Sequence, residues 1–454
     1  MKEKGILYRS TNRLAPEVTF REALLKGQAP DYGLYMPVEI PLLTVEEIAS
    51  FRHMSYAEIA FVIMEKFLPE EIEPASLKKM TLEAYDFDVP IQKVREGLYL
   101  LWLTGGPTAS FKDFAARMMA KMMHFFAGQG HENLTVLVAT SGDTGGAIAN
   151  AFHRLENIRV VVIFPANEVS ERQRRQMTTL GGNVFPVEIS GKFDDCQAIV
   201  KRAFNDTGLA RIGLTSANSI NFGRLLPQAV YYFYALSRIE ENDVVFSVPS
   251  GNFGDLMGGV IARKMGLHIE NFIVAVNEND EFPEFLRTGR YKPVVPSREC
   301  SSNAMNVGHP SNLARLFDLY GGWLTDERDA DGRVLKKGVM RILPDMASLR
   351  TDFSAYSISE NEVDGTIREF YAKYGIIIEP HGAVGVRAAE KFKGGSTVIA
   401  LETADPAKFP EKIRALLNLE PELPRSIAGL DGKKESFHRM KNDYEQFRDF
   451  LREI

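Results

Sequence analysis

Short apolar runs alternate with polar or amphipathic segments from residue 134 onward. The run LTVLVA (134–139) has the length and branching of a buried strand, and VVVIF (160–164) follows it after a segment of small residues typical of a helix. SERQRRQMTTLGG (170–182) and VFPVEI (184–189) continue the pattern as a helix and a strand. This order indicates βαβ units, and therefore a parallel sheet with right-handed crossovers.

A second set of strands follows the same rule. VVFSV (244–248) leads through a glycine-rich loop into the helical pattern DLMGGVIARKMG and then the strand FIVAV (272–276), while STVIAL (396–401) comes much later. Ligands of open α/β sheets bind at the carboxyl ends of strands. Three loops fall there, and we expect them to meet: 140–146, 249–255 and 402–408.

A chain of 454 residues is long for one hydrophobic core, so we expect several lobes. Residues 1–95 lack the alternation and predict an N-terminal helical and mixed lobe. Residues 96–225 predict a small α/β lobe that exchanges edge segments with a large α/β lobe at 226–454. Glycine, proline and asparagine are frequent between about 280 and 345, which indicates a long-loop insertion in the large lobe.

Composition narrows the class of protein. The net charge of −6 and the lack of a Lys/Arg-rich block argue against a nucleic-acid partner. The two cysteines are not spaced as metal ligands and cannot form a disulfide framework, so we expect no metal site and a reducing compartment. No apolar run is long enough to span a membrane, and the N-terminal residues lack a signal core. We therefore expect a cytoplasmic enzyme.

Lys112 occupies an unusual position in GGPTASFKDFAARMMAKMM (105–123). Its helical neighbours are alanines and methionines, which places it on the apolar side of a helix near the positive end. Ser110 is expected to cap this helix, with Asp113 as an acidic partner. Burial and the helix dipole should lower the pKa of Lys112, as a Schiff-base nucleophile requires. The alternative is a lysine whose stem lies on apolar surface while its amine reaches water.

Several loops carry groups suited to anions. In VPSGNFGD (248–255), backbone N–H groups and the following helix dipole could hold a phosphate, although a plain tight turn has the same pattern. TSGDTGG (140–146) could bind a carboxylate or phosphate in the same way, or simply cap its helix. In TSANSINFGRLLPQ (215–228), Arg224 lies near hydroxyl and amide groups, which suits a phosphate dianion, although an ordinary surface arginine is the commoner interpretation. His309 and His381 stand alone in the sequence and indicate structural roles.

Taken together and in order, these motifs resemble one family. The chain contains GGPTASFKDFA, SGDTGGAIANAF, RQMTTLGGNV, DDCQAIVKRAF, SANSINFGRLLPQAVYYFYA, VPSGNFGDL, SSNAMNVGHPSN, EPHGAVGV and TADPAKFP. It resembles the threonine synthases in their longer form, and APDYGLYMP (29–37) is similar to the N-terminal segment of that form. The resemblance extends over nearly the whole chain. It implies pyridoxal phosphate fold type II, which is tryptophan synthase β-like: two lobes of open, mostly parallel sheets with an extra N-terminal lobe.

The resemblance also implies roles for individual residues. Lys112 would carry pyridoxal 5'-phosphate on its amine, and Asp143 would lie near the phenolic oxygen of the cofactor. Thr403 would bond the pyridine nitrogen and leave it largely unprotonated, which suits elimination chemistry. Many relatives have histidine where this chain has Asp405, and a contact from Asp405 to that nitrogen would change the electronic argument; we expect Thr403 to make it. The cofactor phosphate would be held by the backbone amides of Gly251, Asn252, Phe253 and Gly254.

The implied reaction is the conversion of O-phospho-L-homoserine and water to L-threonine and phosphate by β,γ-elimination and water addition. The carboxylate and phosphate ends of the substrate would be bound by Ser141, Thr144, Asn218, Ser219 and Arg224. A phospholyase of the same lineage, which releases 2-oxobutyrate, stays open as an alternative, as does a non-catalytic relative that binds the cofactor. A dehydratase or cysteine synthase would not need Arg224. We expect a monomer or a small homo-oligomer.

Overall fold

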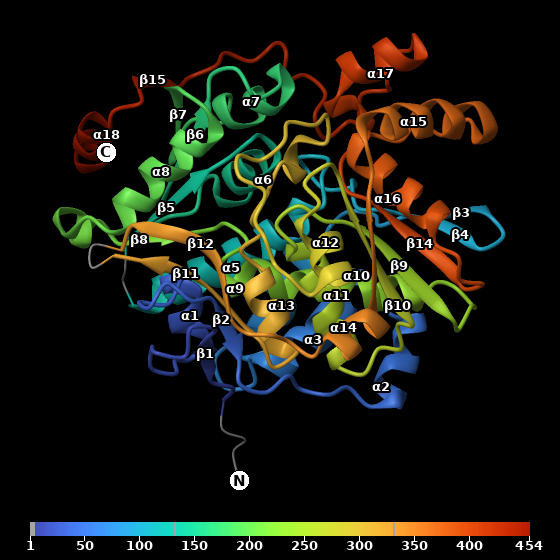
Figure 1. Cartoon of the computed structure of the whole chain (residues 1–454). Helices are drawn as coiled ribbons and strands as arrows, with labels where there is room; N and C mark the ends of the chain where they lie inside the picture. The colour runs from blue at the N-terminus through green and yellow to red at the C-terminus, as the bar shows by residue number, and fades with distance from the viewer. Residues whose placement is uncertain (1–4, 131–132, 330–331) are drawn as a thin grey trace.

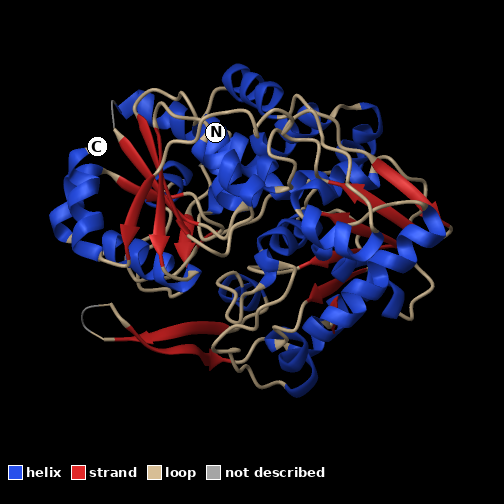
Figure 2. Ribbon diagram, turned by 90° about the horizontal axis from the view of Figure 1, so that it is seen from above, coloured by secondary structure: helices blue, strands red, loops and turns tan. Residues whose placement is uncertain are grey.

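The computed structural model describes residues 5–130, 133–329 and 332–454. Two open sheets lie on opposite sides of the molecule, each covered by helices, with further helices between them (Figure 1, Figure 2). Both are built mainly from parallel strands, as the alternating pattern predicts. The α/β architecture expected from the sequence is therefore confirmed.

The larger sheet has six strands in the order β13-β10-β9-β14-β4-β3. All neighbours are parallel except β3 and β4, which form an antiparallel pair at one edge. The strands are β3 (Ile91–Arg95), β4 (Leu98–Trp102), β9 (Val244–Pro249), β10 (Asn271–Val276), β13 (Phe353–Ser357) and β14 (Thr397–Glu402). The apolar runs expected at 244–248, 272–276 and 396–401 are all strands of this sheet.

The smaller sheet has five parallel strands in the order β15-β7-β6-β5-β8. They are β5 (Leu134–Ala139), β6 (Ile158–Pro165), β7 (Val184–Ser190), β8 (Leu214–Ser216) and β15 (His438–Lys441). The run LTVLVA has the predicted strand bounds, and every residue in it is buried. One edge strand, β15, comes from the far C-terminal part of the chain.

Helices fill both faces of the sheets. Around the smaller sheet lie α5 (Lys112–Gly130), α6 (Asp143–Phe152), α7 (Glu171–Thr178), α8 (Phe193–Phe204), η2 (Thr207–Ile212) and α18 (Tyr444–Glu453). Between the sheets and on the larger sheet lie α9 (Phe222–Leu225), η3 (Leu226–Ala229), α10 (Val230–Leu236), α11 (Gly254–Lys264), α15 (Glu360–Tyr374), α16 (Pro380–Lys391), η5 (Pro406–Lys408) and α17 (Pro410–Leu417).

The N-terminal part is helical with a short hairpin, as its pattern indicates. Its elements are β1 (Tyr8–Ser10), α1 (Phe20–Lys26), β2 (Tyr35–Pro37), α2 (Val45–Ser50), η1 (Phe51–His53), α3 (Tyr56–Phe67) and α4 (Pro74–Ala84). Capping boxes begin α1, α2 and α3. Buried side chains of α1 and α3 join those of α5 and α10 in one continuous hydrophobic cluster, for example where Tyr56 packs on Phe114 and Tyr234.

The segment expected as a long-loop insertion contains α12 (Glu281–Thr288), η4 (Asn303–Met305), α13 (Leu313–Leu319), the hairpin β11 (Trp323–Arg328) and β12 (Val334–Ile342), and, at its end, α14 (Met346–Asp352). Figure 2 shows this hairpin extending below the smaller sheet. The division into three lobes stays a prediction. Three strands cross its boundaries: β3 from residues 1–95 and β4 from residues 96–225 join the larger sheet, and β15 joins the smaller one. None of the described helices has the length and apolar character that a membrane span requires.

Candidate active site

A deep cleft opens where strands of the two sheets end. It has a volume of about 1410 Å³, and the loops after β5, β9 and β14 all contribute to its wall. The expected meeting of loops 140–146, 249–255 and 402–408 is therefore confirmed. The site residues predicted from the sequence that line the cleft are Lys112, Ser141, Asp143, Thr144, Asn218, Ser219, Arg224, Gly251, Asn252, Gly254 and Thr403.

A backbone pairing places Lys112 beside Thr403. The N–H of Phe111 donates to the carbonyl of Thr403 at 2.9 Å, and Ser110 forms an antiparallel bridge with Ala404. This pairing also explains why the expected capping box is wrong. The hydroxyl of Ser110 is buried without a hydrogen-bond partner among the described residues, whereas the Asp113 carboxylate accepts from the hydroxyl of Thr108 at 2.7 Å and from its backbone N–H at 2.8 Å.

Lys112 is the first residue of α5, and its amine lies 4.4 Å from the ring centre of Phe111. The residues that share its side of the helix are buried, as predicted: Ala115, Ala116, Met119 and Met123. Desolvation is the main cause that lowers the pKa of Lys112, and the Lys408 and Arg224 cations lower it further. The carboxylates of Asp143 and Asp255 act in the opposite direction. The pKa therefore shifts as a reactive amine requires, and the amine faces the cleft rather than the outer surface.

Asp143, the first residue of α6, is bound from two sides. Its Oδ1 accepts from Gln173 Nε2 at 2.8 Å and pairs with Lys408 Nζ at 2.7 Å. Burial alone would raise the pKa of Asp143, but the Lys408 cation, the nearby Lys112 and these hydrogen bonds hold it well below its usual range. The carboxylate is therefore ionised at neutral pH. Neither Gln173 nor Lys408 has a sequence signal that announces this role, because both depend on tertiary contacts.

The loop after β9 is shaped for a close ligand. A Cβ on Gly251 would lie 2.5 Å from the carbonyl oxygen of Ala304, so only glycine fits there. Phe253 has a positive φ of 61° and directly precedes α11, while its ring packs on Phe282 at 5.1 Å between centres. Its side chain is thus turned into the core, and only its backbone is available to a ligand. The loop presents backbone amides at a helix start, which is a common phosphate-binding arrangement.

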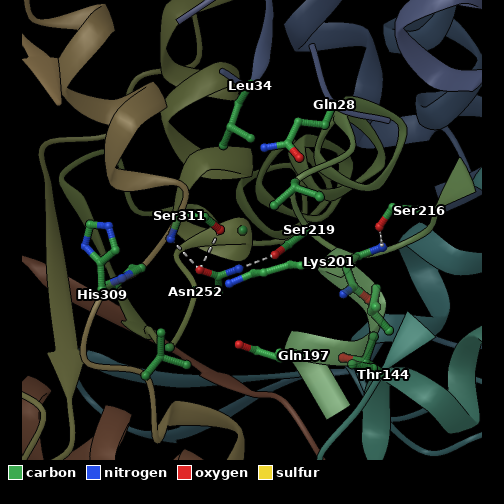
Figure 3. A pocket seen from close by; sticks show the side chains of 18 of the residues that line it. Gln28, Leu34, Thr144, Gln197, Lys201, Ser216, Ser219, Asn252, His309 and Ser311 are labelled. Carbon is green, nitrogen blue, oxygen red and sulfur yellow. Dashed lines mark hydrogen bonds between the residues drawn. The ribbon is translucent and has the colours of Figure 1, made fainter. Parts of the chain in front are cut away.

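Side-chain hydrogen bonds connect Asn252 of the same loop to neighbouring segments of the cleft wall (Figure 3). Asn252 donates to the hydroxyl of Ser219 at 2.6 Å, and its Oδ1 accepts from the backbone N–H of Ser311 at 2.7 Å and from the Ser311 hydroxyl at 2.9 Å. Asn312 donates to the carbonyl of Asn252 at 2.8 Å. Ser311 and Asn312 were not singled out from the sequence, although they lie in the family-like motif SSNAMNVGHPSN. The Asn252 side chain therefore holds Ser219 and Ser311 in place, a contact separate from the phosphate binding expected of its backbone amide.

Arg224 is a buried cation whose Nε–H has no hydrogen-bond partner among the described residues. It is 4% exposed, and burial lowers its pKa to about 10. Nη1 donates to the carbonyl of Ala217 at 3.2 Å, whereas Nε has no partner in the described part of the chain. The nearby Asn218 Oδ1 is also buried without a partner there. Unsatisfied buried groups of this kind are costly and usually await a ligand or water.

Thr403 and Asp405 diverge at the end of β14. Thr403 lines the cleft. The carboxylate of Asp405 instead accepts from the backbone N–H of Ala407 at 2.8 Å and caps η5. This arrangement agrees with the expectation that Thr403 rather than Asp405 faces a bound ring.

Both histidines interpreted as isolated lie on the cleft wall and are bonded to carboxylates. His381 Nδ1 is 2.6 Å from Glu379 Oε2, and His309 Nε2 is 3.0 Å from Asp326 Oδ1. Asp255 also lines the cleft, and burial is the main cause that raises its pKa to about 6. Among the described residues, no group of three or more His, Cys, Asp and Glu side chains could hold a metal ion.

The arrangement suits a phosphorylated carbonyl compound. The Lys112 amine, whose pKa is lowered, can attack a carbonyl carbon. The Gly251 loop lines the same cleft and can bind an anion. A second set of donors around Arg224 remains for another anionic ligand. Both sets line the same cleft.

Comparison with known proteins agrees with this chemistry. The model of the pyridoxal-phosphate dependent enzyme family matches residues 92–403. The models of the threonine synthase N terminus and of the threonine synthase C-terminal region match residues 7–85 and 382–451.

Individual relatives match over almost their full length. The threonine synthase of Haemophilus influenzae is 38% identical over 442 residues, which cover 96% of this chain and 97% of the relative. The structure of the pyridoxal-phosphate-bound threonine synthase from Brucella melitensis superposes with a TM-score of 0.91 at 37% identity and covers 99% of each chain. The Escherichia coli threonine synthase structure gives a TM-score of 0.87 at 34% identity and covers 98% of this chain and 99% of that one. In sequence, fold and cleft chemistry alike, this chain belongs to the threonine synthase family of pyridoxal-phosphate-dependent enzymes.

Proposed function

We propose that the chain converts O-phospho-L-homoserine and water into L-threonine and inorganic phosphate. The observation that supports this most is the presence, in one cleft, of the Lys112 amine, the Gly251 loop and the buried Arg224 guanidinium. An amine and a phosphate cradle serve the cofactor. The second cationic site is what a substrate with its own phosphate needs, and a substrate without a phosphate would leave the Arg224 guanidinium buried and unpaired.

The residues present suit pyridoxal phosphate. The backbone amides from Gly251 to Gly254 would hold its phosphate, where a Cβ on Gly251 would close the loop. Lys112 would hold its carbonyl carbon, Asp143 would lie toward its phenolic oxygen, and Thr403 would face its ring nitrogen. When bound, the cofactor spreads negative charge from the substrate Cα over its ring.

Lys112 is proposed to work as a proton carrier once the substrate amine has displaced it. Burial lowers the pKa of Lys112, which favours the uncharged amine that can accept a proton from the substrate Cα. Lys112 would then return a proton to Cα of the product and would hold the cofactor carbonyl carbon again, so we expect every turnover to need Lys112.

The substrate ends are proposed to bind to residues that line the same cleft as Lys112. Arg224 with Asn218 and Ser219 would bind the phosphate, and Ser141 and Thr144 at the start of α6 would contribute donors to either end. Charge grows on the phosphate oxygens as the Cγ–O bond breaks, so donors that are already fixed in place favour that step. Asn252 fixes Ser219 by a 2.6 Å hydrogen bond and thereby holds one of these donors in position.

Product analysis tests the proposal. Pure protein loaded with pyridoxal phosphate is given O-phospho-L-homoserine, and threonine, 2-oxobutyrate and phosphate are quantified. We expect threonine and phosphate in equal amounts and no turnover of unphosphorylated homoserine. Release of 2-oxobutyrate instead of threonine would identify a phospholyase. No product, with intact cofactor binding that a Lys112→Ala variant lacks, would identify a non-catalytic relative.

We also propose that the protein acts in the cytoplasm as a monomer or a small homo-oligomer. We expect no nucleic-acid partner, because the net charge of the chain is −6. Light scattering at several protein concentrations measures the oligomeric state directly.

A further inference from the structure

A buried ion pair connects the two sides of the cleft beside Lys112. Lys408 Nζ lies 2.7 Å from Asp143 Oδ1, and the two side chains are 1% and 3% exposed. Lys408 belongs to η5, which follows β14 of the larger sheet, whereas Asp143 begins α6, which follows β5 of the smaller sheet. Lys408 Nζ also donates to the carbonyl of Thr108 at 2.8 Å, in the loop that precedes Lys112. One ammonium group thus connects three segments that build the site.

This pair is poorly explained by stability alone. A buried ion pair gains little over well-packed apolar side chains, because both charges lose their hydration. Asp143 Oδ1 already has a neutral donor, Gln173, at 2.8 Å, and the second donor could equally be neutral. Stability therefore does not explain why the second donor to Asp143 is the charged side chain of Lys408.

The reason lies in the charges around the Lys112 amine. The groups that act on it are the carboxylates of Asp143 and Asp255 and the cations Lys408 and Arg224. Asp143 is ionised and would be a natural partner for a lysine ammonium. In the described part of the molecule, the ion pair with Asp143 is made by Lys408 and not by Lys112. Lys408 also repels a proton on Lys112, since it lowers the pKa of that amine.

We propose that Lys408 is a positioning residue that occupies Asp143 as its counter-ion and thereby keeps the neighbouring Lys112 amine unpaired, neutral and free to react. The inference rests on the proposed role of Lys112 but not on the identity of the product. Without Lys408, Asp143 would hold Lys112 as an ammonium ion, and cofactor capture near neutral pH would slow. The ion pair between Lys408 and Asp143 therefore favours the reactivity of Lys112, which is not a member of the pair.

The charge state of Lys112 can be measured without substrate and without cofactor. Full-length protein freed of pyridoxal phosphate is treated with trace acetic anhydride between pH 6 and 11. The acetylation rate of Lys112 is then followed by peptide mass spectrometry against the exposed Lys393 as internal reference. The midpoint of the rate against pH reports the pKa of the amine. The assay is independent of turnover, so a failure of the proposed reaction and a failure of this inference are distinguishable.

Four variants give the inference a defined outcome. Lys408→Met should raise the midpoint by about 1 to 2 units, the size of shift that a nearby opposite charge causes. Asp143→Asn should lower the midpoint, and Asp143→Asn with Lys408→Met should return it to within about half a unit of the parent. Lys412→Met removes a partly exposed lysine of α17 that pairs with Asp364, and it should leave the midpoint unchanged.

The same shifts should appear in cofactor capture. The pH at which half of the Lys408→Met protein develops the absorbance of lysine-bound cofactor should rise with the acetylation midpoint. An unshifted midpoint in Lys408→Met, or a double variant that stays shifted, overturns the inference. If Lys408→Met alone does not fold, the double variant must have a higher midpoint than Asp143→Asn; equal midpoints would refute the repulsion between Lys408 and Lys112.

Discussion

Replacement of Arg224 by methionine should raise the stability of the protein and lower its activity. The side chain is buried, Nε has no partner within the described residues, and Nη1 makes a 3.2 Å bond to the carbonyl of Ala217. An unpaired buried donor on a charged group costs about 1–3 kcal/mol, while the lost bond to Ala217 is worth about 1 kcal/mol. The substrate-free variant should therefore be about 1 kcal/mol more stable than the parent.

Activity should fall steeply in the same variant. If Arg224 binds the substrate phosphate through two of its N–H groups, the contact comprises two charge-assisted hydrogen bonds of about 1.5–3 kcal/mol each. Their loss amounts to about 3–6 kcal/mol, which is a decrease of about 10²- to 10⁴-fold in kcat/KM. Part of the loss should fall on kcat, because the leaving phosphate carries more charge in the transition state than in the substrate.

Chemical denaturation and continuous phosphate release measure the two effects. Arg315→Met is the matched control, because Arg315 is also fully buried but donates to the carbonyls of Tyr35, Ser219 and Ile220 and to Asn312 Oδ1. That variant should be destabilised, since four acceptors lose their donor. Inorganic phosphate should raise the melting temperature of the parent but not of Arg224→Met. A destabilised Arg224→Met variant, or one that keeps kcat/KM within about threefold of the parent, would refute the reasoning.

Four further variants test other features. Gly251→Ala brings a Cβ within 2.5 Å of the Ala304 oxygen and should weaken pyridoxal phosphate binding by at least about tenfold in a spectroscopic titration, and unchanged affinity would contradict the cradle. Asp405→His should change kcat by less than about threefold, because Asp405 only caps η5, whereas Thr403→Val should alter both kcat and the cofactor absorbance. Glu281 is 2% exposed, and burial raises its pKa from an ordinary 4.5 to about 8. The parent protein should therefore lose stability as the pH rises from 4.5 to about 8. Glu281→Gln does not titrate, and its advantage in free energy of unfolding should grow between pH 5 and 9 to the order of 4 kcal/mol; a constant difference would show that Glu281 is not desolvated.

Much of the cleft could be predicted because its loops follow strands that are visible as apolar runs. Parallel strands bring their carboxyl ends to one edge, so the order of motifs was enough to place Asp143, Gly251 and Thr403 together. Lys112 was identifiable because a cation at an apolar helix position contradicts the periodic pattern around it. Such local contradictions often mark functional residues.

Other parts depend on contacts that no local pattern reveals. Ser110 has the residue type of a helix cap, but its backbone pairs with Ala404, and the carboxylate of Asp113 turns to Thr108 instead. Lys408 is followed by an aromatic residue in the sequence and resembles any surface lysine until Asp143 is brought against it. The lobe boundaries were drawn from changes of pattern along the chain. Such changes cannot show that a strand near the C-terminus completes a sheet built mainly from residues 134–216.

That late strand has a consequence for how the molecule is made during translation. β7 can pair with β6 as soon as both have left the ribosome, but its other edge has no partner until β15 is synthesised. The helix after β15 contributes Tyr444 and Arg448 to the rim of the cleft. A nascent chain thus carries an unpaired β7 edge and an incomplete cleft rim until β15 and α18 are synthesised. A chaperone that protects the chain would bind at this β7 edge.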